Sequence, residues 1–193
     1  MKTKHHFLIF ILLIVLSFFS FFVDKHAFGF VEKIKNPFFD ALFGYITNFG
    51  NIFVVLILVT SLFLWQERKK EWIPTLWISY GAAIIVSFLI KISVQRPRPF
   101  FKNFYPLINL PDYAFPSMHA VAAFAAIPVL DREFPKLKWF WILFALLILF
   151  SRVYLRVHYL SDVIFGALIG YAIGWIFMEI EIKHKIFKRL KWI

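Results

Sequence analysis

The sequence predicts an all-α polytopic membrane protein with six transmembrane helices. Hydrophobic residues make up 61% of the chain and the mean hydropathy is +0.75, both above what a water-soluble globule carries. A spanning helix needs about 20 apolar residues, so the shorter second and fourth segments are expected to gain flanking residues. The six apolar segments are 7–23, 51–65, 72–90, 117–130, 139–155 and 160–178.

The first segment follows Lys2 and Lys4, an arrangement that also suits a secretory signal peptide. Its apolar run is longer than the usual core of a signal peptide, and the stretch VDKHAFG is a poor cleavage site. We therefore expect an uncleaved first helix.

The connection to the second segment contains its own helix signal. Asn36 precedes Pro37, and proline suits the first position of a helix. Phe38, Leu42 and Ile46 would then share one face, which predicts a short helix lying in the membrane interface. An extension of the second span is the alternative interpretation.

The third segment ends in the stretch KISVQRPRP. Lys91 closes the apolar run, and Arg98 stands between Pro97 and Pro99, which disfavour a helix and hold the backbone extended. Two cations on a stiff segment suit a phosphate group. Taken alone, the cluster also fits an ordinary polar membrane boundary.

The fourth segment begins with FPSMHA. Pro116 ends the preceding loop, and Ser117 is a suitable N-cap for the small-residue helix that follows. The N-terminus of a helix favours an anion, and His119 would stand beside it in the first turn. A histidine that is merely polar at a boundary is again the plainer interpretation.

Between the fifth and sixth segments lies SRVYLRVHYLSD. If the helix starts near residue 158, His158 and Asp162 share one face, and the carboxylate can orient the imidazole and stabilise its cation. Arg152 would meet them only if the chain turns between the two segments. Arg156 receives no role beyond a boundary cation.

The distribution of lysine and arginine predicts the orientation, since cytoplasmic connections carry more of them. One side holds thirteen: Lys2, Lys4, Arg68, Lys69, Lys70, Arg132, Lys136, Lys138, Lys183, Lys185, Lys188, Arg189 and Lys191. The other holds nine: Lys25, Lys33, Lys35, Lys91, Arg96, Arg98, Lys102, Arg152 and Arg156. Both termini are therefore expected in the cytoplasm, and the three polar clusters outside.

Charge and cysteine content limit the possible partners. The net charge of +11 is spread between apolar blocks, which indicates contact with anionic lipids rather than with nucleic acid. The absence of cysteine excludes disulfides and thiolate metal sites. Without internal repeats or low-complexity linkers, residues 1–193 are expected to form a single domain.

Together the three clusters resemble the type 2 phosphatidic acid phosphatase family. The family pattern reads here as Lys91 to Arg98-Pro99, then Pro116-Ser117-Met118-His119, then Ser151-Arg152, His158 and Asp162. The resemblance covers residues 91–162. Met118 replaces the usual glycine, which would matter if that position needed a positive φ or a very close approach to phosphate.

The resemblance implies a lipid phosphatase with its active site at the outer surface of the cell membrane. His158 would form a phosphohistidine, Asp162 would orient it, and His119 would donate a proton to the leaving group. The implied phosphate-binding residues are Lys91, Arg98, Arg152, and Ser117 with neighbouring amides such as that of Met118. No metal or other cofactor is implied. Undecaprenyl diphosphate, phosphatidylglycerol phosphate and phosphatidic acid are compatible substrates.

Two other classes of protein remain open at this point. A lipid-binding or transport protein could use the same charges to line a pathway, although the clusters lie on one side and form no relay through the spans. A metallohydrolase could use His119, His158 and Asp162 as metal ligands.

Overall fold

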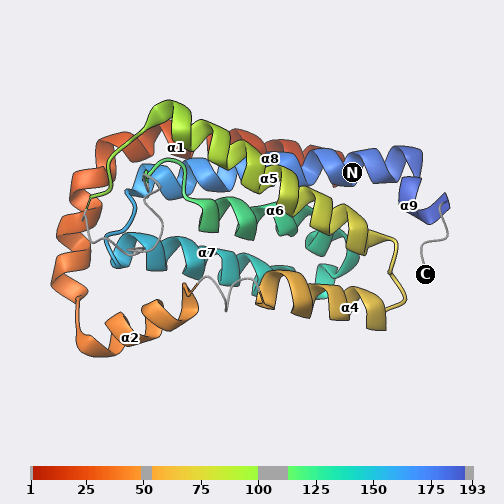
Figure 1. Ribbon diagram of the computed structural model, residues 1–193, viewed down its shortest axis with the longest axis horizontal. Coiled ribbons are helices and arrows are strands. Elements are labelled where there is room, and N and C mark those ends of the chain that lie inside the picture. The colour runs from red at the N-terminus through yellow and green to blue at the C-terminus, as the bar shows by residue number, and fades with distance from the viewer. Residues whose placement is uncertain (1, 49–53, 100–112, 190–193) are drawn as a thin grey trace.

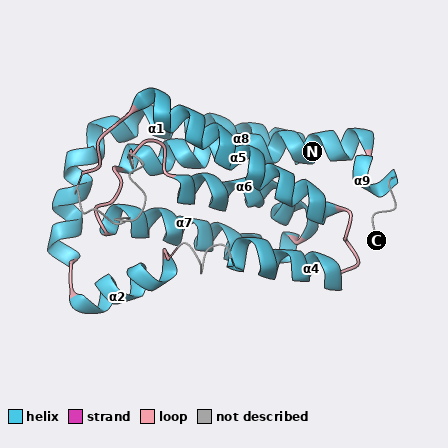
Figure 2. Cartoon of the chain, viewed as in Figure 1, coloured by secondary structure: helices cyan, strands magenta, loops and turns pink. Residues whose placement is uncertain are grey.

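The computed structural model describes residues 2–48, 54–99 and 113–189, and the regular structure of this part of the chain is helical (Figures 1 and 2). The helices are α1 (Lys2–Ile34), α2 (Pro37–Ile46), η1 (Val54–Val59), α4 (Thr60–Gln66), α5 (Trp72–Val94), α6 (Met118–Glu133), η2 (Pro135–Leu137), α7 (Lys138–Tyr154), α8 (Leu160–His184) and α9 (Ile186–Arg189). The all-α prediction is confirmed for the described residues.

Four helical stretches are long and apolar enough to cross a membrane: His6–Ile34, Trp72–Val94, Pro135–Tyr154 and Leu160–His184. The second predicted segment corresponds to the shorter helical stretch Val54–Gln66, which begins with a π-helical turn. The fourth corresponds to α6, with 16 residues, whose central residues are buried among the other helices. Six spans therefore stay a prediction.

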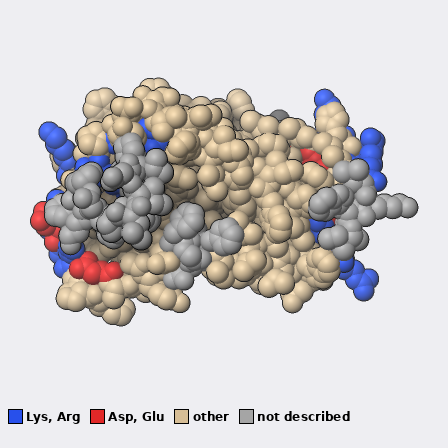
Figure 3. Space-filling view, viewed as in Figure 1, with Lys and Arg blue, Asp and Glu red and all other residues tan. Residues whose placement is uncertain are grey.

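On the face shown in Figure 3, charged side chains gather at the two ends of the molecule, and a broad uncharged band separates them. Large apolar side chains such as Phe18, Leu89 and Leu143 are exposed. Lipid is the solvent that stabilises such a surface, so the chain is a membrane protein. Both chain termini lie toward one end of the bundle, on the right in Figure 1.

The closest helix contact joins α6 and α8 and depends on a stripe of glycines. Gly166, Gly170 and Gly174 recur every four residues on α8, so they share one face. A Cβ at Gly170 would lie 2.1 Å from the carbonyl oxygen of Val121, and a Cβ at Gly174 would lie 2.2 Å from that of Ala125. The absence of side chains therefore lets the two backbones touch.

Helix α1 is longer than the predicted segment 7–23. Its 33 residues would extend about 50 Å at about 1.5 Å per residue, beyond the roughly 30 Å hydrocarbon core. The helix changes direction, and its C-terminal part crosses the left-hand end of the bundle (Figure 1). Ser17 and Ser20 donate hydrogen bonds to the carbonyls of Leu13 and Ser17, both 2.7 Å, a bonding pattern that bends helices.

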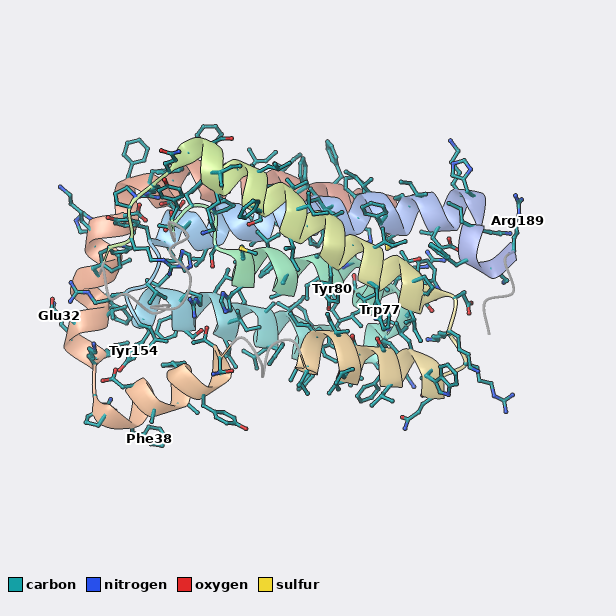
Figure 4. All side chains as sticks on the ribbon, viewed as in Figure 1. Glu32, Phe38, Trp77, Tyr80, Tyr154 and Arg189 are labelled. Atoms are coloured by element: carbon teal, nitrogen blue, oxygen red, sulfur yellow. The ribbon has the colours of Figure 1, made fainter. Side chains whose placement is uncertain are left out.

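The short helix predicted after Asn36 is confirmed as a separate element, α2. The Asn36 side chain accepts a hydrogen bond from the amide of Phe39 at 3.0 Å, and Pro37 occupies the first turn. Phe38 is 70% exposed on the outer side (Figure 4), whereas Phe43 is buried against α7. The alternative of a simple extension of the second span is not observed, because α2 ends at Ile46 with Thr47 as its C-cap.

We predict that Gly170→Ala destabilises the protein, because the added methyl group would overlap the backbone of Val121. Overpacking of this kind costs about 1–3 kcal/mol. Thermal unfolding of the purified protein in detergent would measure the loss. Gly81→Ala is the matched control, since a Cβ there meets nothing within 4 Å. Equal melting temperatures for the two variants would contradict the importance of this contact.

Candidate active site

The N-termini of α6 and α8 meet at the end of the bundle that lies opposite the chain termini, which we call the site end. The Ser117 amide, just before α6, donates to the carbonyl of Asp162 in the first turn of α8 at 3.1 Å. A Cβ at Gly166 would lie 2.8 Å from the carbonyl oxygen of Ser117. The glycine contact therefore brings the second and third polar clusters together.

The chain turns between α7 and α8, which is the condition under which Arg152 was expected to meet His158 and Asp162. The carbonyl of Arg152 accepts from the amides of Val157 at 3.2 Å and His158 at 3.3 Å, which closes the end of α7. Arg156 occupies the left-handed region within this turn, with φ 56°. Its side chain lies over the ring of Phe28 and 3.6 Å from Glu32, so it contacts α1.

The expectation that His158 lies on the helix with Asp162 was wrong. Helix α8 begins at Leu160 with Tyr159 as its N-cap, so His158 precedes it. Asp162 still reaches it, because its Oδ2 turns back to accept from the Tyr159 amide at 2.8 Å. The same oxygen lies 3.6 Å from Nδ1 of His158.

The two ring nitrogens of His158 therefore face different groups. Nδ1 is directed toward the Asp162 carboxylate, whereas Nε2 lies 3.5 Å from Nη1 of Arg98. Arg98 is fixed there by donating to the carbonyl of Val157 at 2.9 Å. With the proton on Nδ1, the lone pair of Nε2 points toward a guanidinium group, where an anionic phosphate would bind.

His158 is 1% exposed, and this burial lowers its pKa well below the usual value of 6.5. The nearby charges of Arg152, Arg98 and Lys91 lower the pKa further. The carboxylate of Asp162 favours the protonated imidazole and so acts to raise this pKa. Its single negative charge is outweighed by the burial and by the several nearby cations. The imidazole is therefore neutral at pH 7, the form in which its nitrogen is nucleophilic.

The three cations of the predicted site come from different parts of the fold. Lys91 lies in the last turn of α5 and donates to the carbonyl of Tyr113. Arg98 follows the end of that helix, and Arg152 lies in the last turn of α7. The charges of all three act on both His119 and His158. The site is thus strongly positive and suited to an anion.

Ser117 is the residue before α6, as predicted, but its hydroxyl makes no capping hydrogen bond. Its Oγ is buried and has no hydrogen-bond partner among the described residues. Met118, which replaces the usual glycine, is the first residue of α6 and has no positive φ. The backbone conformation therefore does not require glycine at this position.

Asp24 and Arg96 join the site, although the sequence analysis gave neither a role. Arg96 donates to Oδ1 of Asp162 at 2.6 Å and to Oδ2 of Asp24 at 2.9 Å. Asp24 also accepts from the amide and the hydroxyl of Ser161, at 2.8 and 2.6 Å. The guanidinium group of Arg96 lies over the ring of Tyr159 at 3.9 Å. Helix α1 is thereby connected to the carboxylate beside His158.

The sequence contained a signal that predicts this pairing of Asp24 with an arginine. Asp24 directly follows the first apolar run, at a depth where an unpaired carboxylate is costly, so a cationic partner was required. Arg96 is the first arginine of RPRP, and only the second had been assigned.

His119 lies in the first turn of α6, half-buried, and its imidazole donates a hydrogen bond to the backbone carbonyl of Thr47. Across the described ranges, no group of three or more histidine, aspartate or glutamate side chains is placed to hold a metal ion. The alternative ligand set of His119, His158 and Asp162 is thus not assembled in this structure.

Known proteins resemble this chain in sequence and in fold. An undecaprenyl-diphosphatase from Sulfolobus acidocaldarius is 36% identical over 150 residues, which is 74% of this chain and 70% of that protein. Phosphatidylglycerophosphatase B from Bacillus subtilis is 27% identical over 169 residues, 81% of this chain and 82% of that protein.

Two crystal structures share the fold. A transmembrane PAP2-type phosphatidylglycerolphosphate phosphatase from Bacillus subtilis has a TM-score of 0.67 at 20% identity, over 93% of this chain and 96% of that one. LpxE from Aquifex aeolicus has a TM-score of 0.66 at 26% identity, over 81% of this chain and 95% of that one. The PAP2 superfamily model matches residues 72–185, more than half of the sequence and all three polar clusters. The chain therefore belongs to the PAP2 superfamily.

Proposed function

We propose that the protein is a membrane lipid phosphatase that removes the terminal phosphate of a lipid phosphate or diphosphate through a phosphohistidine intermediate. One observation carries this proposal: the three polar clusters meet at the site end, where His158 lies between Asp162 and Arg98. The relatives with phosphatase names support the reaction class.

In the first step, Nε2 of His158 attacks phosphorus as the bond from phosphorus to the leaving oxygen breaks. The proton on Nδ1 stays on the imidazole, and the nearby Asp162 carboxylate stabilises the positive charge that develops. His119 gives its proton to the leaving oxygen, so that the lipid departs as an alcohol or as a monophosphate.

In the second step, water attacks phosphorus and the bond between phosphorus and Nε2 breaks. His119, now without its proton, accepts one from the attacking water. Inorganic phosphate leaves, and His158 returns to its neutral form. His119 thus serves as acid in one step and as base in the other.

The phosphoryl oxygens carry the charge through both steps, and Lys91, Arg98 and Arg152 are the groups that bind them. The Ser117 hydroxyl and the first-turn amides of α6 add neutral donors. Fixed donors in a buried site stabilise the transition state without reorganising. In this mechanism no step needs a metal ion, so we expect turnover to continue in excess chelator.

The substrate class follows from where the site lies. The site end is a charged end of the molecule that adjoins the uncharged band (Figure 3). In a membrane protein such a boundary is expected to lie among the lipid headgroups. Undecaprenyl diphosphate, phosphatidylglycerol phosphate and phosphatidic acid all present a terminal phosphate there. The names of the relatives favour the first two.

We infer that residues 1–193 form a single domain with six spans, an outward-facing site and cytoplasmic termini in the cell membrane. The bond between Asp24 and Arg96 supports including α1 in this domain. The position of the site and the termini at opposite ends supports the orientation, together with the thirteen cations predicted on the side of the termini.

His158→Ala is expected to abolish phosphate release from every lipid, because it removes the nucleophile. Asp162→Asn should be severely impaired through loss of the charge beside the imidazole. Phosphate release by purified protein in excess chelator would measure both. His184→Ala, at an exposed histidine of the opposite end, is the matched control. Substantial activity in His158→Ala would exclude the phosphohistidine mechanism.

His119→Ala should lose more activity on monoester lipids than on lipid diphosphates. A monoester expels a strongly basic alkoxide, whereas a diphosphate expels a phosphate that needs less protonation. General acid catalysis contributes about 10²–10⁴-fold, and its share falls as the leaving group improves. Phosphate release from phosphatidic acid and undecaprenyl diphosphate, each at saturating concentration, would compare the two losses.

Equal losses on the two lipid classes, without accumulation of a phosphoenzyme, would instead assign His119 to phosphate binding. Accumulation of a phosphoenzyme would indicate that hydrolysis of the intermediate has become rate-limiting, which agrees with the second role of His119 as the base.

The proposed orientation predicts the labelling of single cysteines in intact cells, since the chain has none of its own. Glu32 is exposed at the site end (Figure 4), and Glu67 is exposed in the connection between α4 and α5. A membrane-impermeant thiol reagent should label Glu32→Cys in intact cells and Glu67→Cys only after permeabilisation. The reverse pattern would place the site in the cytoplasm.

A further inference from the structure

Thr47 lies between two groups of the proposed site, although it belongs to none of the three clusters. It follows α2, and only 5% of its surface is exposed. Its Oγ1 accepts a hydrogen bond from Nη1 of Arg152 at 2.7 Å. Its backbone carbonyl accepts the hydrogen bond of the His119 imidazole. One residue thus contacts a phosphate-binding cation on α7 and the proton donor on α6.

The position of Thr47 is fixed by the packing of α2 against the end of α7. The Tyr154 hydroxyl bonds to the backbone of Asn36, accepting from its amide at 3.1 Å and donating to its carbonyl at 3.3 Å. In the middle of α2, the Phe43 ring lies 5.3 Å from that of Phe150 and 4.8 Å from that of Tyr154. At the C-terminus of α2, the Thr47 amide donates to the carbonyl of Phe43 at 3.0 Å.

The opposite face of α2 carries large exposed side chains. Phe38 is 70% exposed, Tyr45 is 73% exposed, and Leu42 is 38% exposed. Figure 4 shows Phe38 on the outer side of α2, away from Tyr154 at the end of α7. An amphipathic helix of this kind lies in the membrane interface. A displacement of α2 by the surrounding lipid would therefore move Thr47 and change the geometry of the site.

We propose that Thr47 is a positioning residue of the active site, whose hydroxyl holds Arg152 on the phosphate and whose carbonyl holds His119 toward the leaving group. The inference rests on the proposed phosphatase function. Thr47 itself does not touch the substrate. It fixes one ring nitrogen of His119 as a donor, which leaves the other nitrogen to exchange a proton with substrate or water.

The hydroxyl is tested by Thr47→Val, which keeps the shape and the carbonyl but loses the acceptor for Arg152. A hydrogen bond to a charged group contributes enough free energy to change a binding constant about tenfold or more. We therefore expect KM to rise about tenfold with kcat within about twofold of wild type, and Thr47→Ser to restore KM. Rates of phosphate release from undecaprenyl diphosphate give both constants.

Thr75→Val is the matched control. Thr75 is equally buried, at 2% exposure on α5, and its hydroxyl has no hydrogen-bond partner among the described residues. Its kinetic constants should equal those of wild type. An unchanged KM in Thr47→Val, or an equal rise in Thr75→Val, would overturn the inference. No phosphate release by the wild-type protein from any lipid would instead overturn the proposed function.

The carbonyl is tested through the packing of α2, because a backbone group cannot be removed by substitution. Phe43→Ala loosens α2 from α7 and should displace both Thr47 contacts, so that kcat falls together with a rise in KM. Phe38→Ala on the outer face should change neither constant in detergent. A Phe43→Ala protein that unfolds near the wild-type temperature yet keeps wild-type constants would contradict a positioning role for α2.

Discussion

The contact between α6 and α8 is the constraint on which the rest of the structure depends. Three glycines on α8 let its backbone touch the carbonyl groups of α6, and a methyl group at Gly170 or Gly174 would overlap them. At this separation the Ser117 amide bonds directly to the Asp162 carbonyl, so the helix that carries His119 begins beside the helix that follows His158. Without a hydrophobic driving force between helices in lipid, close packing of this kind is a main source of association.

A second constraint is electrostatic. Asp162 is fully buried, and an ionised carboxylate there is stable only if it is paired and hydrogen-bonded. Arg96 and the Tyr159 amide supply those partners, and Asp24 balances the charge of Arg96. Removing one member of such a network leaves an uncompensated buried charge, which is strongly destabilising. Asp24 therefore makes α1 part of this network, through its contacts with Arg96 and Ser161.

The membrane explains why these charges lie where they do. A charged side chain near the centre of a span costs about 2.5–3.5 kcal/mol on insertion scales, whereas helix ends avoid most of that cost. The protein therefore keeps an uncharged band and confines its charges to the two ends (Figure 3). The same arrangement suits catalysis on a lipid headgroup, since the acyl chains can stay in the bilayer while the phosphate meets the cations. Burial in turn keeps His158 neutral.

The sequence by itself determined the features that depend on neighbouring residues. Apolar runs defined the long helices, Asn36 and Pro37 defined the start of α2, and the spacing within the motifs identified the family. Only the tertiary structure decided that His158 precedes its helix, that α6 is short, that Arg96 bonds to Asp24, and that Arg152 bonds to Thr47. These last contacts join residues 72 and 105 positions apart in the chain. Hydropathy, capping and motif spacing act over a few residues, whereas such contacts exist only once helix packing has set which ends and faces meet.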